Sequence, residues 1–474
     1  MPGFSERHAI IVGGGASGVL LAYQLLRQGG AGLHVTLVEK SADIARGLAY
    51  RTDNPDHLLN VRAANMSALP DAPDHFWRWL NDRPADLPVD PTPFCFVSRR
   101  IYGDYLNDLV KPFLANHTEA SRLTRRAGEC VRINEASDCV TIGLADGTQI
   151  RGDVVILATG HEVAATQSHG QTETHIRTET TERDAVLILG TGLTMVDQVL
   201  SLRRGGHRGP IVAMSRRGLI PRAHRHIAPL SLRETDIPFG ASIGALTRWI
   251  RLRIASHCAA GGDWRSVIDA LRPFSQKLWR ELPAQSRRRF LEHARAWWDV
   301  HRHRMSPDIE RLIAQAMSEG QLILKAGKVV RIEDRANSTR VIYRPRGKTE
   351  HEYLDVSGII DCTGFGSANL SANPALRSLL DQGLARPDPL RIGLDISENS
   401  AIIRADGTLS PRLFAVGPVT RAAFWEISAI PDIRNQCAKL AGDIANDLVQ
   451  GRLSRRRPDQ TGRYKSVCDP QTAP

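Results

Sequence analysis

Two glycine-rich segments of this chain have the residue types and the spacing needed to hold a pyrophosphate. The first, Gly13-Gly14-Gly15-Ala16-Ser17-Gly18, has the pattern G-x-G-x-x-G and lies between an apolar stretch and a helical pattern. Its first glycine allows a tight turn, its second lets phosphates approach the backbone, and its third lets helix and strand pack closely. Glu39, 21 residues after Gly18, ends the next predicted strand, where a carboxylate can accept hydrogen bonds from ribose hydroxyls.

The second segment, Gly190-Thr191-Gly192-Leu193-Thr194-Met195, keeps the first two glycines but has methionine at the third position. This departure predicts looser packing of helix against strand, with the phosphate turn retained. The next strand ends in Ser215-Arg216-Arg217, where a carboxylate would favour NADH. Charge-assisted hydrogen bonds to a 2′-phosphate contribute roughly 1.5–3 kcal/mol each, so Arg216 and Arg217 favour NADPH. The alternative is that both arginines are solvated charges on a surface loop.

The elements around these segments predict an α/β protein with two Rossmann-like dinucleotide-binding lobes. Each glycine segment follows an apolar strand, at 9–12 and 185–189, and precedes a helix and a second strand. Ala158-Thr159-Gly160 and Asp361-Cys362-Thr363-Gly364 each follow a further apolar strand, where the chain would leave and re-enter the first lobe. The expected parts are 1–165 and 351–450 for the first lobe, 166–350 for the second with a helical insertion at about 243–321, and a disordered tail at 451–474.

Composition limits the possible functions. The chain has 474 residues and a formal charge of +11, but its basic residues are spread out and do not alternate with aromatic residues, which argues against nucleic-acid binding. Anionic cofactors and a small anionic substrate account for the charge. The seven cysteines form no C-x-x-C pair and no metal spacing, so no metal is expected. No signal peptide or run of about 18 apolar residues is present, which predicts a cytoplasmic protein without a membrane anchor. The sequence does not indicate an oligomeric state.

Further motifs carry a resemblance to a known family. They are Gly47-Leu48-Ala49-Tyr50, the segment His57 to Ser67 (HLLNVRAANMS), Tyr102-Gly103-Asp104-Tyr105-Leu106, Trp298 to Arg304 (WDVHRHR) and Gly417-Pro418. With the two glycine segments, the chain resembles the two-dinucleotide flavoprotein oxidoreductases and flavin monooxygenases over nearly its whole length. The further motifs give a closer resemblance to the FAD/NAD(P)-binding flavoprotein family that includes L-aspartate N-monooxygenase and a bacterial FAD-dependent urate hydroxylase.

The resemblance implies which residues hold the cofactors. FAD would be bound through Gly13, Gly15, Ser17, Gly18 and Glu39, with the loop Asn60 to Ser67, Gly160 and Gly417 also contributing. The second glycine segment and the arginines after the next strand, rather than the resemblance, predict that NADPH is bound by Gly190, Gly192, Arg216 and Arg217. The Gly417-Pro418 pair departs from the Gly-Asp of disulfide reductases, and with the missing C-x-x-C it argues against that class. The motif F-x-G-x-x-x-H-x-x-x-W of Baeyer–Villiger enzymes is absent.

The function that this resemblance implies is an FAD-dependent, NADPH-consuming monooxygenase. It would use O2, act through a peroxyflavin, and oxygenate a small anionic nitrogen-containing substrate of the amino-acid or purine type. The flavin would be the reactive centre, so no catalytic side chain is named. Arg302 and Arg304 are candidates for clamping the substrate anion, although an ordinary basic helix face is an equal alternative. Two other functions stay open: an NADPH-dependent reductase or dehydrogenase without oxygen transfer, and a low-turnover redox-sensing FAD/NADPH-binding protein.

Overall fold

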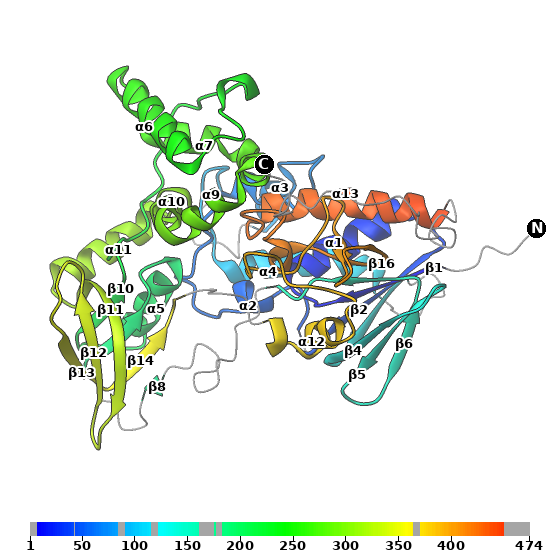
Figure 1. The fold of residues 1–474 in the computed structure, drawn as a ribbon, viewed down its shortest axis with the longest axis horizontal. Helices are drawn as coiled ribbons and strands as arrows, with labels where there is room; N and C mark the ends of the chain where they lie inside the picture. Colours follow the sequence, from blue (N-terminus) through cyan, green and yellow to red (C-terminus); the bar gives the residue numbers. More distant parts are fainter. Residues whose placement is uncertain are drawn as a thin grey trace, which may run out of the picture. The chain divides into compact units, whose positions relative to one another are not determined.

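The chain folds into two compact units in a computed structural model that describes residues 7–41, 43–83, 91–114, 122–160, 175–176, 183–363 and 370–449 (Figure 1). The first unit comprises Met1–Pro55, Val61–Ala164 and Ser367–Pro474, and the second comprises Asp56–Asn60 and Ala165–Gly366. The expected disordered tail at 451–474 lies outside the described residues. Within the described part, no helix is both long and apolar enough to cross a membrane.

A six-stranded sheet forms the centre of the first unit. All neighbouring strands in it are parallel except the pair at one edge, β15 and β16. The helix α1 (Ala16–Gln28) packs against α13 (Ile430–Val449) and α4 (Arg99–Val110). In sheet order the strands are β15 (Ala401–Ile403), β16 (Leu409–Ala415), β7 (Val154–Leu157), β1 (Arg7–Val12), β2 (Leu33–Glu39) and β3 (Leu123–Ala127).

The second unit repeats this arrangement around a seven-stranded sheet. Its strands β14, β9, β10 and β11 are parallel, and α5 (Leu193–Arg204) and α11 (Pro307–Ser318) belong to the same unit. In sheet order the strands are β13 (Glu352–Val356), β12 (Thr339–Pro345), β11 (Leu322–Asp334), β10 (Ile211–Ser215), β9 (Val186–Leu189), β14 (Gly358–Asp361) and β8 (His175–Ile176). Two parallel-sheet dinucleotide folds were predicted, and both are present.

The unit boundaries differ from the expected ones in two places. Strand β14 pairs with β9, so residues 358–361 belong to the second sheet, and the second unit extends to Gly366 rather than to residue 350. Residues 56–60 were expected in the first lobe but belong to the second unit. An apolar run indicates a buried parallel strand, but the run itself does not specify which sheet it joins.

Helices occupy the interval between β10 and β11. They are α6 (Ile243–Ala259), α7 (Trp264–Ala270), α8 (Ser275–Glu281), α9 (Ala284–Arg289), a π-helical turn η6 (Phe290–Ala294), α10 (Arg295–Arg302) and α11. In the first unit, short helices follow β2: α2 (Gly47–Tyr50), the 3-10 helix η1 (Ala63–Asn65) and α3 (His75–Asn81).

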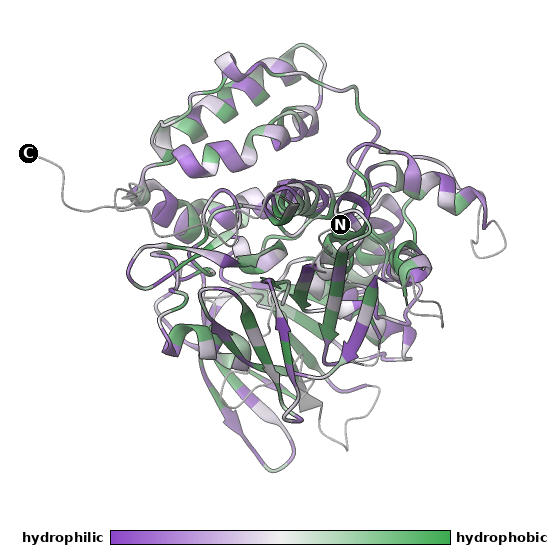
Figure 2. Cartoon of the chain, turned by 90° about the vertical axis from the view of Figure 1, so that its right-hand side faces the viewer, coloured by the Kyte–Doolittle hydropathy of each residue, from purple (hydrophilic) through white to green (hydrophobic). Residues whose placement is uncertain are grey.

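Each unit buries the apolar strands at the centre of its sheet. Ile10 and Ile11 on β1 and Ile188 on β9 are fully buried, and the long hydrophobic stretches of the strands stand out in Figure 2. In the second unit the same core contains Met195 from α5 and Ile313 from α11. Burial of such side chains contributes about 1.5–3 kcal/mol each, which fixes the helices on their sheets.

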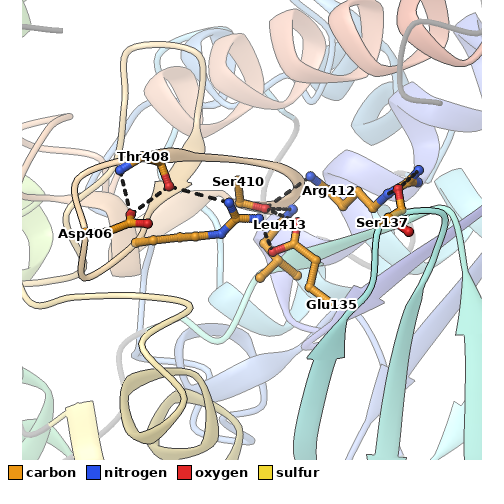
Figure 3. A network of polar contacts seen from close by, with 8 residues as sticks. Glu135, Ser137, Asp406, Thr408, Ser410, Arg412 and Leu413 are labelled. Carbon is orange, nitrogen blue, oxygen red and sulfur yellow. Dashed lines mark hydrogen bonds and ion pairs between the residues drawn. The ribbon is translucent and has the colours of Figure 1, made fainter. Parts of the chain in front are cut away.

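A separate antiparallel sheet in the first unit is pinned by buried charges. It consists of β4 (Cys130–Glu135), β5 (Val140–Leu144) and β6 (Gln149–Gly152). Glu135 accepts hydrogen bonds from Ser410 and Arg404, at 2.7 Å each. Figure 3 shows Glu135 beside Ser410. The fully buried Arg412 donates to the carbonyl oxygens of Ser137 and Asp153, at 3.0 and 2.9 Å. These bonds tie the small sheet to β16 and the start of β7.

Candidate nucleotide sites

The first glycine turn is built so tightly that side chains are excluded at two positions. Gly13 has a φ of +111°, and a Cβ there would lie 2.4 Å from the carbonyl oxygen of Ala158 at the end of β7. A Cβ on Gly18 would lie 1.9 Å from the carbonyl oxygen of Gly13. The first and third glycines therefore bring β1, β7 and α1 together, as their pattern predicts.

The second glycine faces open space at the start of α1. A Cβ on Gly15 would meet only the Cα of Gly47, at 3.7 Å, and no side chain caps the helix. By contrast, Ser306 caps α11 and Asn373 caps α12 (Pro374–Asp381) with their side chains. The first-turn N–H groups of α1 are thus left for an anionic ligand, which is the arrangement that binds pyrophosphate.

Glu39 is fixed beside this turn by backbone donors. Its Oε2 accepts the N–H of Gly14 at 2.7 Å, and its Oε1 accepts the N–H of Ser41 at 3.0 Å. A carboxylate has about four acceptor positions, so further lone pairs can accept ribose hydroxyls. The geometry fits the predicted contact of Glu39 with a ribose.

A short loop that glycine spacing did not reveal closes over the same turn. Ala45, with a φ of +72°, donates its N–H to the carbonyl oxygen of Gly14 at 2.7 Å. Gly47, with a φ of +45°, approaches so closely that a Cβ would lie 3.3 Å from the Cα of Gly15. Arg46 forms an ion pair of 2.7 Å with Asp104 on α4. The motif that starts at Gly47 was the one sequence signal for this loop.

Gly417 lies against the start of α1. Its φ is +73°, and a Cβ there would lie 2.3 Å from Oγ of Ser17. Its N–H donates to Oε1 of Gln436 on α13 at 2.8 Å, and Nε2 of Gln436 donates to Oγ1 of Thr420 at 3.1 Å. No motif indicated Gln436, because its partner is 19 residues away in the chain.

The strand end beside Gly13 carries an unsatisfied polar atom. Oγ1 of Thr159 is buried and has no hydrogen-bond partner among the described residues. Gly160, next in the chain, has a φ of +71°, and a Cβ on it would have no other atom within 4 Å. A buried hydroxyl without a hydrogen-bond partner, next to a glycine with free space around it, is suited to contact a ligand bound at the first glycine turn.

The second glycine turn has the same backbone geometry. Gly190 has a φ of +104°, and a Cβ there would lie 2.3 Å from the carbonyl oxygen of Cys362 at the end of β14. Nothing lies within 4 Å of a Cβ on Gly192, and no side chain caps α5. Met195, at the position of the third glycine, is fully buried in the core. The position of the third glycine is therefore occupied by a core side chain in this unit.

The loop after β10 is held against the second turn. The hydroxyl of Thr191 donates to the carbonyl oxygen of Leu219 and is 2.9 Å from Oγ of Ser215. Arg216 is exposed and has no hydrogen bond or ion pair with another described residue. Arg217 donates through Nη2 to the carbonyl oxygen of His293 at 2.9 Å. Both guanidinium groups are on the loop where a 2′-phosphate would be recognised.

Arg302 and Arg304 lie inside the helical insertion of the second unit. Both are buried, and Arg304 forms an ion pair with Asp269. Burial, followed by the charges of Arg302 and Arg265, lowers the pKa of Arg304 below its usual value. Such pairing favours a packing contribution for Arg304 over a contact with substrate.

Asn60 is also held within the second unit. Its carbonyl oxygen is 3.0 Å from Nε2 of His224. The residues that follow it, Val61 to Ser67, belong to the first unit.

The cysteines do not form a redox pair in the described part of the chain. Cys362 is buried beside the second turn, and burial raises the pKa of its thiol to about 12. Burial also raises the pKa of Cys437, whose Sγ contacts the carbonyl oxygen of Ser17. These thiols stay protonated at neutral pH, whereas a redox-active cysteine needs a thiolate. Among the described residues, no group of three or more His, Cys, Asp or Glu side chains could hold a metal ion.

Comparisons with known proteins agree with this geometry. Residues 10–162 match the family model described as FAD-NAD(P)-binding. An uncharacterized protein of Mycobacterium tuberculosis is 23% identical over 294 residues, which cover 57% of this chain and 53% of that protein. An uncharacterized protein of Mycobacterium bovis matches to the same extent. The chain thus spans about half the length of the curated relatives it matches.

Solved structures match over most of the chain. The L-lysine 6-monooxygenase of Pseudomonas syringae aligns with a TM-score of 0.63 and 15% identity, covering 93% of this chain and 99% of that one. The reduced ornithine hydroxylase of Pseudomonas aeruginosa has a TM-score of 0.60 and 14% identity, with the same coverage. An ornithine N-hydroxylase of Kutzneria sp. 744, solved with reduced FAD, NADP+ and L-ornithine, has a TM-score of 0.60 and 15% identity, covering 92% and 98%. Residues 10–162 thus resemble an FAD-NAD(P)-binding domain, and the chain as a whole has the fold of these monooxygenases, with two parallel-sheet dinucleotide-binding lobes.

Proposed function

We propose that this protein is an FAD-dependent, NADPH-consuming monooxygenase that oxygenates a small anionic, nitrogen-containing substrate. The observation that carries the proposal is the pair of glycine turns, one in each unit, each with an uncapped helix and open space at its second glycine. Two such turns suit two dinucleotides, as an enzyme that passes a hydride from one to the other requires.

The two cofactors are assigned to different units. We assign FAD to the first turn, where Gly13, Gly15 and Gly18 would admit its pyrophosphate and Glu39 would bind a ribose. Ser17 and Gly417 would close the same site through their mutual contact. Asn60 and Gly160 are the remaining residues that we assign to FAD binding.

NADPH is assigned to the second turn. Gly190 and Gly192 would admit its pyrophosphate at the start of α5. Arg216 and Arg217 would pair with the 2′-phosphate. For that contact Arg217 would exchange its bond to the carbonyl oxygen of His293 for a charge-assisted one, which is the stronger of the two.

Bound FAD would supply the hydride-accepting and oxygen-transferring chemistry, and the protein would position and shield it. The residues described above would bind and orient the two cofactors. Glu39 would hold a ribose of FAD, and the uncapped N–H groups of α1 and α5 would neutralise the charge of the pyrophosphates. No side chain is needed as a covalent nucleophile in this scheme.

Oxygen transfer is favoured over thiol chemistry by the absence of a C-x-x-C pair from the sequence and by the burial of Cys362 and Cys437. Three of the similar structures are named for hydroxylation of ornithine or lysine, amino acids with a side-chain amine. This supports a substrate that carries both an amine and a carboxylate. We assign Arg304 to packing of the helical insertion because it is paired with Asp269.

The first experiment is an anaerobic visible spectrum of the protein reconstituted with FAD, before and after addition of NADPH or NADH. The proposal predicts a flavin spectrum that NADPH bleaches much faster than NADH. Replacing both arginines, Arg216→Ser with Arg217→Ser, should lower the preference for NADPH by about tenfold or more. Arg344→Ser, at an exposed arginine on β12, is the matched control and should leave the preference unchanged. A protein that retains no FAD would overturn the proposal.

The second experiment separates oxygen transfer from its alternatives. With O2 present, small amino acids with side-chain amines and purines are screened for faster NADPH oxidation and for a hydroxylated product by mass spectrometry. A monooxygenase yields product in proportion to the NADPH consumed. A reductase without oxygen transfer reduces an organic acceptor instead, and a redox sensor consumes NADPH negligibly with every compound.

A further inference from the structure

A five-residue segment of the chain belongs to the second unit although its neighbours on both sides belong to the first. This segment, Asp56–Asn60, is called the strap. The chain before it, to Pro55, and the chain after it, from Val61, are parts of the first unit. The strap therefore adds two places where the chain passes between the units, besides those at residues 164–165 and 366–367.

The beginning of the strap is bound to the middle and the C-terminal end of α5. Asp56 forms an ion pair with Arg204, with 2.8 Å between Oδ2 and Nη1. Nε2 of the buried His57 is 3.0 Å from the carbonyl oxygen of Asp197 and 2.9 Å from Oγ of Ser201. Because a carbonyl oxygen only accepts, Nε2 must carry a proton to make the first contact. His57 thus contacts two successive turns of α5.

The end of the strap is bound to other parts of the second unit. Leu58 packs against the core cluster that contains Met195 of α5. The carbonyl oxygen of Asn60 is 3.0 Å from Nε2 of His224, and the N–H of His224 donates to the carbonyl oxygen of Met305 at 2.9 Å. The strap is therefore fixed along its whole length by the unit that carries the second glycine turn.

Immediately after the strap, the chain is fixed to the first unit. The N–H of Ala63 donates to the carbonyl oxygen of Cys95 at 3.0 Å, and the N–H of Ala64 donates to that of Pro93 at 2.9 Å. The N–H of Ala68 donates to the hydroxyl of Tyr105 at 3.1 Å. Only Val61 and Arg62 separate the two sets of anchors, so the chain has little slack between them.

We propose that the strap transmits pyridine-nucleotide binding at the second glycine turn to the loop 61–67 of the first unit, with His57 as the positioning residue. The inference rests on the proposed function, which places NADPH at the start of α5 and FAD beside this loop. Asp197 is five residues after Gly192, or about 7.5 Å along the helix axis at 1.5 Å per residue. A nucleotide bound at the first turn of α5 can shift this helix or reduce its motion. His57 contacts the same helix one and two turns further on, at Asp197 and Ser201, so such a change reaches the strap.

Coupling of this kind is an interaction free energy between two sites, and it acts in both directions. NADP+ bound at α5 should order loop 61–67, and FAD bound beside that loop should tighten NADP+ binding by the same factor. Of the polar contacts between the strap and α5, those of His57 are buried, whereas the ion pair of Asp56 with Arg204 is half-exposed. Loss of His57 should therefore weaken the coupling more than loss of Asp56.

Amide hydrogen exchange of the FAD-loaded protein, with and without saturating NADP+, tests the inference without a turnover assay. In the wild type we expect NADP+ to slow exchange in a peptide from the second turn, 190–200, and also in a peptide from the loop, 61–69. The expected protection of the loop peptide is roughly fivefold, the lower end of usual coupling factors. The change in the flavin absorption spectrum on NADP+ addition is a second readout.

Two variants target the link and two serve as controls. His57→Ala should keep NADP+ protection of 190–200 but lose most of it in 61–69, and should reduce the NADP+-induced flavin difference spectrum. Ser201→Ala removes a single hydroxyl partner of His57 and should produce a smaller loss in the same direction. His57→Gln retains an N–H donor at a similar reach and should restore part of the response. Glu319→Gln breaks the bond of Glu319 with Arg203, also on α5 but not on the strap, and should change neither peptide's response.

The outcomes are distinct. Protection of 190–200 without any effect on 61–69 in the wild type would overturn the strap proposal and leave the cofactor assignment standing. Equal protection of 61–69 in the wild type and in His57→Ala would also overturn it. Failure of NADP+ to protect 190–200 would overturn the assignment of NADPH to α5 and the strap proposal together.

Discussion

The two units build the same phosphate turn but attach the following helix differently. In both units only glycine fits at the first position, because a Cβ there would clash with a carbonyl oxygen at the end of a neighbouring strand. This oxygen belongs to Ala158 in the first unit and to Cys362 in the second. In the first unit Gly18 brings α1 down onto the turn, whereas in the second Met195 fills the same position with a buried side chain. The two units therefore share the first glycine of the turn and differ in the residue at the third position.

The units also differ in how they hold their antiparallel strands. In the first, β4, β5 and β6 form a separate sheet that Arg412 and Glu135 pin by buried polar bonds (Figure 3). In the second, the 13-residue strand β11 runs from the parallel sheet into the antiparallel one, with a register shift between Val329 and Arg331. An apolar cluster that includes Val341 and Tyr343 packs against this sheet.

The largest expected effect tests the third position of each turn. Met195→Ala should destabilise the second unit by roughly 2–5 kcal/mol because it leaves a cavity in the core. Gly18→Ala should prevent α1 from closing on its turn and abolish FAD retention, because its Cβ has no room. Urea unfolding followed by unit-specific hydrogen exchange measures the first effect, with Thr194→Ala, an exposed neighbour, as control. A Met195→Ala loss under about 1 kcal/mol would contradict the buried assignment.

A smaller effect is expected at the second position, on binding rather than on folding. Gly15→Ala and Gly192→Ala add a methyl group where the protein leaves space, at negative φ angles of −70° and −86°. Both proteins should keep the wild-type melting temperature. A methyl group in the path of a pyrophosphate should reduce the binding free energy by roughly 1–3 kcal/mol. Calorimetry should therefore show weaker binding of FAD to Gly15→Ala and weaker binding of NADP+ to Gly192→Ala. If either variant weakens the other unit's cofactor instead, the assignment of the two turns is reversed.

The polar anchor of the first unit provides the next prediction. Arg412→Met should leave the carbonyl oxygens of Ser137 and Asp153 without their donor, at a cost of about 1–3 kcal/mol. The loss should appear as faster hydrogen exchange in β4 to β6, with β12 and β13 of the other unit unaffected. Lys439→Met, which breaks an exposed ion pair with Asp443 on α13, is the control and should have little effect. Uniform destabilisation of both units would show that the anchor is not local.

The smallest effect concerns pH and the second unit. Burial, and then the hydrogen bond to Glu352, raises the pKa of Tyr343 from 10.0 to about 12. The neutral phenol is favoured in the folded state, so its contribution to stability is complete below about pH 10 and is lost as the pH rises towards 12. Tyr343→Phe should lower the free energy of unfolding by about 0.5–1.5 kcal/mol at neutral pH. In this variant the free energy of unfolding should fall less steeply between about pH 10 and pH 12. Tyr353→Phe, at an exposed position on β13, should leave the pH profile of unfolding as in the wild type.

Much of the architecture was predictable from the sequence. Glycines 13, 15 and 18 were predicted to form a turn, because each has a distinct steric reason that spacing alone expresses. The strands at 154–157 and 186–189 were recognisable as apolar runs, since strands covered on both faces are apolar throughout.

Other features needed the folded chain. The sheet to which residues 358–361 belong, the closing of Ala45 and Gly47 over the first turn, and the support of Gly417 by Gln436 were not indicated by spacing. The sequence by itself determined the local rules: where a strand ends, where a helix begins, and where only glycine fits. Tertiary structure decided which distant segments meet, including the strap on α5 and the pairing of Arg304 with Asp269, because such contacts join residues whose separation along the chain leaves no periodic trace.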